Sequence, residues 1–134
     1  MGAPSSSPDL AVFFAALADP TRLRLLNLMN GREVCVCYFV EILKQSQPKI
    51  SRHLAYLKRA GIVDARREGK WMHYKIRDLD GGVAPILAAT LGRLQADRGM
   101  QADLARLSRA CCEPQQFVSL QGAPRPAAMS PELR

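Results

Sequence analysis

The sequence predicts a mainly helical domain with a small β-hairpin, in the arrangement called a winged helix-turn-helix. Three observations predict it: helical apolar spacing through most of residues 8–110, a basic amphipathic segment after a short turn at 45–48, and alternating apolar residues beyond that segment. We therefore expect a flexible leader over residues 1–7, one domain over 8–110, and a cysteine pair with an unstructured tail over 111–134.

The first two expected helices each begin with a capping residue followed by proline, at Ser7-Pro8 and at Asp19-Pro20. The second ends at Asn30-Gly31, because glycine readily adopts the left-handed conformation that follows a helix. Apolar residues recur at helical spacing in both segments, namely Leu10, Phe13, Phe14 and Leu17 in the first and Leu23, Leu26 and Met29 in the second.

A third helix is expected over residues 34–44 and a basic fourth helix over 47–60. The fourth has one apolar stripe, formed by Ile50, Leu54 and Leu57, that must face a core. Its opposite face is basic and suits phosphates and base edges, although alone it is equally compatible with a solvated amphipathic helix. The predicted DNA contacts on this helix are Gln47, Lys49, Ser51 and Arg52 near bases, Tyr56 and Arg59 on the backbone, and His53 beside the stripe.

Between residues 62 and 76 the apolar period changes from helical to alternating. Glu68-Gly69-Lys70 lies between the two runs as a hairpin turn, so a two-stranded wing follows the helix-turn-helix. Arg66, Arg67 and Lys70 are expected at its tip, and Arg67 and Lys70 are predicted to contact DNA. For each of these three residues the alternative is a solvated charge, or a phosphate contact that does not depend on the DNA sequence.

After Asp80-Gly81-Gly82, a further apolar stripe predicts a fifth helix that bends or ends near residues 97–99. The stripe is too long and too apolar for a helix on so small a domain to leave in water. We expect it to bury against the first helix of a second copy, giving a homodimer. Its members are Val83, Ile86, Leu87, Leu91 and Leu94, followed by Leu104 and Leu107.

Composition restricts the classes of function. The formal charge of +7 and the pI near 9.7 suit a polyanionic partner, most often nucleic acid, though an acidic protein or an anionic membrane surface would also fit. No run reaches the ~20 apolar residues of a membrane span and no signal peptide is evident, so a cytoplasmic location is expected. In that compartment Cys35, Cys37, Cys111 and Cys112 are candidate soft-metal ligands or redox groups rather than a disulfide framework.

Five short motifs occur in a specific order and spacing: Asp19-Pro20-Thr21-Arg22, Glu33-Val34-Cys35-Val36-Cys37, residues 47–54, residues 57–61 and residues 66–71. Together, over roughly residues 9–95, they resemble the ArsR/SmtB family of metalloregulators. The resemblance implies a homodimeric winged-helix repressor that sits on a palindromic operator and leaves it when a toxic metal or metalloid binds.

The arsenic-sensing branch of that family carries a Cys-Val-Cys box at the start of the third helix, which Cys35-Val36-Cys37 resembles. The usual box continues with Asp and Leu, whereas Tyr38 and Phe39 follow here, and Cys111-Cys112 is the obvious replacement for a further nearby cysteine. Soft thiolates select soft ions, and As(III) or Sb(III) is expected to take three sulfurs. The sequence leaves open which three of the four cysteines bind one ion, and whether they come from one subunit or from two.

The spacing of Cys35 and Cys37 restricts how a single ion can bind both thiols. Two residues apart on a regular helix, Cys35 and Cys37 point about 200° away from each other. One ion can hold both only if the backbone there is extended or distorted, so we expect binding to reshape the start of the helix and thereby disturb the DNA-binding helix packed against it.

Other interpretations remain. Zinc or another thiophilic metal is less favoured as the ligand, because the fifth helix contains no histidine. A redox sensor of the same fold would use a disulfide, an architectural DNA binder would need no cysteine chemistry, and a small thiol enzyme would need a substrate cleft. No phosphate-cradling loop or His/Asp constellation supports an enzyme, so we expect a regulator without catalytic activity.

Overall fold

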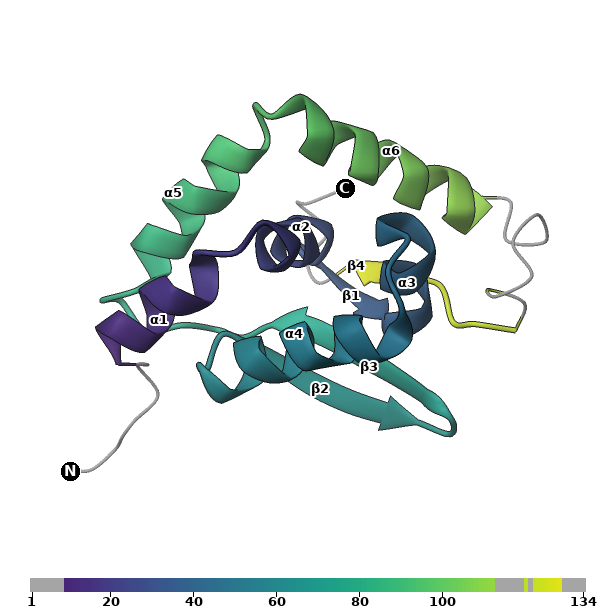
Figure 1. The fold of residues 1–134 in the computed structure, drawn as a ribbon, viewed down its shortest axis with the longest axis horizontal. Helices are drawn as coiled ribbons and strands as arrows, with labels where there is room; N and C mark the ends of the chain where they lie inside the picture. Colours follow the sequence, from purple (N-terminus) through teal and green to yellow (C-terminus); the bar gives the residue numbers. More distant parts are fainter. Residues whose placement is uncertain (1–8, 113–119, 121, 129–134) are drawn as a thin grey trace.

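The computed structural model describes residues 9–112, 120 and 122–128. These form a winged helix-turn-helix, as predicted, in which α3 and α4 are the helix-turn-helix and β2–β3 is the wing (Figure 1). In order the elements are α1 (Leu10–Leu17), α2 (Pro20–Leu28), β1 (Arg32–Cys35), α3 (Val36–Leu43), α4 (Gln47–Arg59), β2 (Val63–Glu68), β3 (Trp71–Ile76), α5 (Ala84–Leu94), α6 (Arg98–Cys112) and β4 (Ala127–Ala128).

The core lies between the helices and one face of the sheet. The apolar stripe of α4, formed by Ile50, Leu54 and Leu57, is fully buried, which confirms its predicted orientation. Figure 1 shows α4 lying along the hairpin β2–β3, while α5 and α6 form an arc beyond α2. None of the helices in the described ranges is long and apolar enough to cross a membrane.

The N-cap of the first helix lies two residues after the one that the sequence suggested. Asp9 accepts a hydrogen bond from the backbone N–H of Val12 at 3.1 Å and is the N-cap of α1. The predicted cap at Ser7 lies outside the described residues. For α2 the prediction is confirmed, since Asp19 accepts from the Arg22 N–H at 3.0 Å with Pro20 as the first helical residue.

The start of the expected third helix is instead a strand. Gly31 takes a positive φ of 78° after α2, and the chain then extends as β1. β1 pairs antiparallel with β3, in the register Val34 with Tyr74 and Cys35 with His73. The sheet order is therefore β2-β3-β1-β4, and β1 joins the cysteine box directly to the wing.

The expected fifth helix is two helices. α5 ends at Leu94, and Asp97 caps α6 by accepting a hydrogen bond from the Met100 N–H at 3.0 Å. We predicted that the helix bends or ends near residues 97–99, and the structure confirms that it ends shortly before them. α6 then continues to Cys112.

Part of the C-terminal region differs from the unstructured tail that we expected. Leu120 is buried in the core, and β4 pairs antiparallel with β1 in the register Glu33 with Ala127 and Arg32 with Ala128. A strand edge offers unpaired backbone N–H and C=O groups, so even a segment without apolar periodicity can pair with it. That edge exists only once the sheet has formed.

A buried carboxylate connects α2 to α6. Asp103 is almost fully buried and accepts hydrogen bonds from Arg24 Nε at 2.8 Å and Arg24 Nη2 at 3.0 Å, and a further one from Arg106. A paired, bidentate arrangement of this kind satisfies a charge that would be costly to bury alone.

We expect Asp103→Ala to lower the free energy of unfolding by about 3 kcal/mol, the lower end for breaking a buried pair, because the Arg24 side chain is 30% exposed. Urea titration should show a lower midpoint with an unchanged slope. Asp78→Ala, which removes an exposed carboxylate after β3, is the control. Equal midpoints for the two variants would contradict this role of Asp103.

Candidate DNA interface and thiol site

The basic helix α4 is fixed at its start by a tight turn. Lys44, with φ 58°, is the left-handed residue that ends α3, and Ser46 caps α4 by accepting a hydrogen bond from the Lys49 N–H at 3.4 Å. Pro48 lies in the first turn, as predicted. With its apolar stripe buried, the helix presents the face that carries Gln47, Lys49, Arg52 and Arg59 to solvent.

The structure leaves most of the predicted DNA-contact residues accessible. On α4, Gln47, Lys49, Arg52 and Arg59 are exposed, whereas Ser51, His53 and Tyr56 are half-buried. On the wing, Arg67 and Lys70 are exposed on either side of Gly69, whose positive φ of 59° closes the two-residue turn. These residues belong to two neighbouring elements, so one duplex could contact both.

Arg22 is a structural residue of this interface that sequence reasoning missed. Its Nε donates to the carbonyl of Ala16 at 2.8 Å and its Nη2 to that of Ala15 at 3.2 Å, at the end of α1. Its Nη1 lies 3.2 Å from His53 Nδ1, and its guanidinium carbon lies 4.0 Å from the centre of the Tyr56 ring. In the sequence, the motif Asp19-Pro20-Thr21-Arg22 is the feature that could have indicated a structural role for Arg22.

These contacts change the interpretation of His53. Its Nδ1 lies 3.2 Å from Arg22 and 3.8 Å from Asp19 Oδ1, so its ring faces the α1–α2 connection. Burial lowers the pKa of His53, and the opposing attraction of Asp19 is smaller. His53 therefore contacts Arg22 and Asp19 within the protein, and its contact with DNA stays a prediction.

One wing arginine is not at the tip. Arg66 Nη2 lies 2.7 Å from Glu33 Oε1, and this hydrogen bond holds the pKa of Glu33 below its usual value. The pair joins β2 to β1 across the sheet. Arg66 was expected at the tip with Arg67 and Lys70, but the structure places it on the body of the wing.

The first cysteine pair has converging side chains. Cys35 ends β1 and is the N-cap of α3, with an extended backbone (φ −72°, ψ 143°), and its Sγ lies 3.0 Å from Cys37 Sγ. The hydrogen bond from the Cys37 thiol lowers the pKa of the Cys35 thiol to about 6, and the same bond raises the pKa of Cys37. The expectation that the two thiols diverge until a ligand reshapes the helix was wrong, because Cys35 is not helical.

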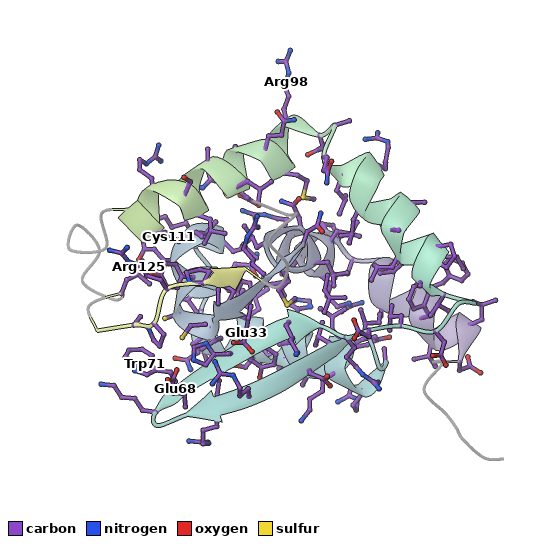
Figure 2. The ribbon with its side chains drawn as sticks, turned by 180° about the vertical axis from the view of Figure 1, so that it is seen from behind. Glu33, Glu68, Trp71, Arg98, Cys111 and Arg125 are labelled. Carbon is purple, nitrogen blue, oxygen red and sulfur yellow. The ribbon has the colours of Figure 1, made fainter. Side chains whose placement is uncertain are left out.

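The second cysteine pair lies at the end of α6. The Cys111 side chain is half-buried and interacts electrostatically with Arg32 and Tyr38, whereas the side chain of Cys112 lies outside the described part of the chain. Figure 2 shows Cys111 and Arg125 on one side of the molecule, where α6 ends near β4. Within the described residues, no three His, Cys, Asp or Glu side chains form one metal-binding group.

Tyr38 is the second residue that sequence reasoning did not assign to the site. It is fully buried, and its hydroxyl has no hydrogen-bond partner in the described structure. Burial raises the pKa of Tyr38 to about 12, and the Cys111 and Cys37 thiols contribute in the same direction. A polar atom in this state calls for an explanation.

The proteins to which this chain is similar are transcriptional regulators, in agreement with the helix-turn-helix and wing described above. A family model described as "Bacterial regulatory protein, arsR family" matches residues 19–65. The chain is 53% identical over 70 residues to an uncharacterized HTH-type transcriptional regulator, MJ1325, of Methanocaldococcus jannaschii, covering 51% of this chain and 78% of that one. It is 50% identical over 64 residues to the arsenical resistance operon repressor of Escherichia coli, covering 47% of this chain and 55% of the repressor.

Solved structures of transcriptional regulators are also similar to this chain. HlyU from Vibrio cholerae has a TM-score of 0.56 at 30% identity, over 65% of this chain and 91% of its own. The AntR antimony-specific transcriptional repressor has a TM-score of 0.51 at 31% identity, over 62% and 70%. The chain thus belongs to the arsR family of bacterial regulatory proteins, and it is a winged helix-turn-helix transcriptional regulator rather than an enzyme.

Proposed function

We propose that this protein is a cytoplasmic, homodimeric repressor that binds operator DNA and leaves it when As(III) or Sb(III) binds to its thiols. One observation carries the proposal: Cys35 and Cys37 lie with their sulfurs 3.0 Å apart where β1 meets α3, in a chain of this family. The names of two relatives, an arsenical resistance operon repressor and an antimony-specific repressor, support the class of ligand.

The DNA side of the proposal rests on α4 and the wing. We place α4 in the major groove, with Gln47, Lys49, Ser51 and Arg52 near base edges. Tyr56 and Arg59 then face the phosphate backbone, and Arg67 and Lys70 reach from the wing. His53 supports α4 from behind through Arg22.

The thiols fit a trivalent metalloid. Such ions are thiophilic and bind thiolates, and the low pKa of Cys35 supplies one thiolate near neutral pH. Cys37 is half-buried, which leaves the pair reachable by a small solute. Cys111 and Cys112 are the candidates for further sulfur ligands, from the same subunit or its partner. Zinc is the less favoured alternative, because residues 83–107 contain no histidine.

The coupling to DNA is proposed to run through β1. Cys35 faces His73 of β3 in the sheet register, and His73 Nε2 lies 2.8 Å from Glu68 Oε1 beside the wing turn. Glu33, also on β1, holds Arg66 of the wing. A displacement of β1 by the ligand therefore moves the wing, and typical couplings of about 1–3 kcal/mol would change operator affinity by about 5–150-fold.

The dimer is proposed to form through α1 and α5. Leu10 and Phe14 on α1 are 53% and 48% exposed, unusually accessible for large apolar side chains on a small domain. α5 lies at the same end of the molecule in Figure 1, and its Ile86 and Leu91 are only partly buried. A second copy would cover these side chains and set the half-sites about 34–36 Å apart.

A thiol redox switch is the second candidate, favoured by the same short distance between sulfurs. Peroxide could oxidise the Cys35 thiolate to a sulfenic acid, which the Cys37 thiol would convert to a disulfide with release of water. Mass spectrometry after mild peroxide treatment, compared with arsenite treatment, separates the two candidates.

A titration tests the proposed function directly. The protein is bound to a labelled duplex that it has selected from a random-sequence library, and arsenite, antimonite, zinc, cadmium or lead is added while anisotropy is recorded. We expect arsenite and antimonite to release the DNA at the lowest concentrations. An unchanged anisotropy with saturating arsenite and antimonite on reduced protein would refute metalloid sensing.

We expect the double variant Cys35→Ser/Cys37→Ser to bind the duplex as the wild type does and to stay bound when arsenite is added, because it lacks the convergent sulfur pair. The same anisotropy titration measures this. Cys111→Ser/Cys112→Ser is run in parallel. Release of the Cys35→Ser/Cys37→Ser protein at wild-type arsenite concentrations would assign sensing to the second pair.

We expect Arg52→Ala to reduce duplex affinity by about 5–150-fold, because a base contact in the major groove contributes roughly 1–3 kcal/mol. Arsenite binding should be unchanged. Arg98→Ala is the matched control, since Figure 2 shows this exposed arginine at the start of α6, far from the wing residue Glu68. Loss of both DNA and arsenite binding in Arg52→Ala would contradict the separation of the two surfaces.

We expect Phe14→Glu to convert the dimer into a monomer in light scattering after size exclusion, because a charge would replace an apolar contact in the interface. Ser108→Glu, on the exposed side of α6, adds the same charge as a control. Circular dichroism verifies that both variants are folded. A Phe14→Glu protein of unchanged mass would place the interface elsewhere.

A further inference from the structure

The described C-terminal residues, Leu120 and 122–128, form a segment that we name the C-terminal strap. Leu120 is buried in the core, and its carbonyl accepts a hydrogen bond from the Ala123 N–H at 3.0 Å. Gly122 has a φ of 80°, as a type II turn requires at its third position. The strap then runs to β4, which pairs with the edge of β1. It is therefore held in the core at one end and on the sheet at the other.

The strap is ordered but weakly held. Pro124 and Pro126 restrict its backbone, which lowers the entropy lost when it docks. Its strand β4 has only two residues, seen in yellow beside β1 in Figure 1. A segment with so short a ladder opens at a lower free energy than the core, so we expect a single unfavourable residue in its turn to release it.

The strap packs against the wing at Trp71. A β-carbon added to Gly122 would lie 4.0 Å from Cζ2 of the Trp71 ring, so the indole is the neighbour of the turn. Trp71 is the first residue of β3 and pairs with Glu68 across the wing turn. Figure 2 shows Trp71 and Glu68 at the end of the wing, on the side of the molecule where Arg125 of the strap lies. The strap thus contacts the wing tip.

The Trp71 ring also contacts a predicted DNA-contact residue. Lys70 Nζ lies 5.0 Å from the centre of the ring, within the range of a cation–π interaction. Lys70 is exposed, so its long side chain has many rotamers available unless a neighbour restricts it. The indole restricts Lys70 only while the indole itself keeps one rotamer, and the contact with Gly122 limits the rotamers of the indole. A row of contacts therefore runs from the strap through Trp71 to Lys70.

We propose that the C-terminal strap, acting through Trp71, positions Lys70 for its contact with the DNA backbone. The proposal rests on the wing contact in the proposed function. Trp71 is a positioning residue, because it orders a side chain that would otherwise lose rotamer freedom on binding. Release of the strap therefore removes one ordered phosphate contact for each subunit and leaves α4 unchanged.

The test releases the strap in the full chain. Gly122→Val does so because a β-branched residue rarely adopts a positive φ. Gly81→Val is the matched control, since Gly81 is also exposed, has no positive φ and has open space around it. Ala127→Pro/Ala128→Pro removes two backbone N–H groups from β4 and is a second way to release the strap, which replaces Gly122→Val if that variant does not fold. Circular dichroism verifies folding.

Trp71 is the single tryptophan of the chain, so its fluorescence reports the strap directly. We expect Gly122→Val to shift the emission to longer wavelength and to make the ring more accessible to acrylamide. Duplex affinity is measured by anisotropy at several salt concentrations.

We expect Gly122→Val and Lys70→Ala each to bind about 8-fold more weakly per subunit at about 0.1 M salt, as for the loss of one phosphate contact. The slope of log affinity against log salt concentration should be shallower by about 0.9 per subunit in both variants. The double variant Gly122→Val/Lys70→Ala should bind no more weakly than Lys70→Ala alone, because the strap acts through the same contact. Gly81→Val should bind as the wild type does.

Several results overturn the proposal. An unchanged emission in both Gly122→Val and Ala127→Pro/Ala128→Pro would show that the strap does not cover Trp71. A shifted emission with wild-type affinity would show that the strap does not act on DNA binding, and a double variant whose loss is the product of the two single losses would show that it does not act through Lys70. In each case Lys70→Ala still binds DNA more weakly and the proposed function stands. A Lys70→Ala protein with wild-type affinity and salt slope overturns the wing contact and this proposal together.

Discussion

The pairing of β1 with β3 is the constraint on which the site depends. It keeps Cys35 extended at the exact point where α3 begins, and that backbone turns the Cys35 sulfur toward Cys37. It also aligns Cys35 with His73, so that one short strand belongs both to the thiol site and to the wing. A helical Cys35 would separate the sulfurs and remove the direct connection to the wing.

Polar contacts between elements fix the remaining surfaces. Arg22 joins the end of α1 to His53 and Tyr56 of α4, and Asp103 joins α6 to Arg24 of α2. Each contact pairs a charged or polar group that is partly buried. A group left unpaired in such a low-dielectric environment would lower the free energy of unfolding. These contacts orient the helices more specifically than apolar packing alone, which tolerates many side-chain arrangements.

The first cysteine pair is linked to the wing through β1, which pairs with β3 and carries Glu33, the partner of Arg66. Movement of β1 would reach Arg66 through Glu33 and the wing turn through His73 and Glu68. A ligand changes DNA affinity only if it binds the two arrangements of this strand unequally. Arg67, the exposed wing arginine proposed to contact DNA, follows Arg66 directly in β2.

The sequence by itself determined the order of helices and wing, the buried stripe of α4 and the family, because periodicity, caps and turn residues are local signals. It also identified the cysteines and most of the outward residues of α4. Only the tertiary structure decided that Cys35 is extended, that His53 faces Arg22, that Arg66 binds Glu33 and that Tyr38 is buried without a partner. Strand pairing and side-chain partners depend on segments distant in sequence, and a local pattern carries no information about them.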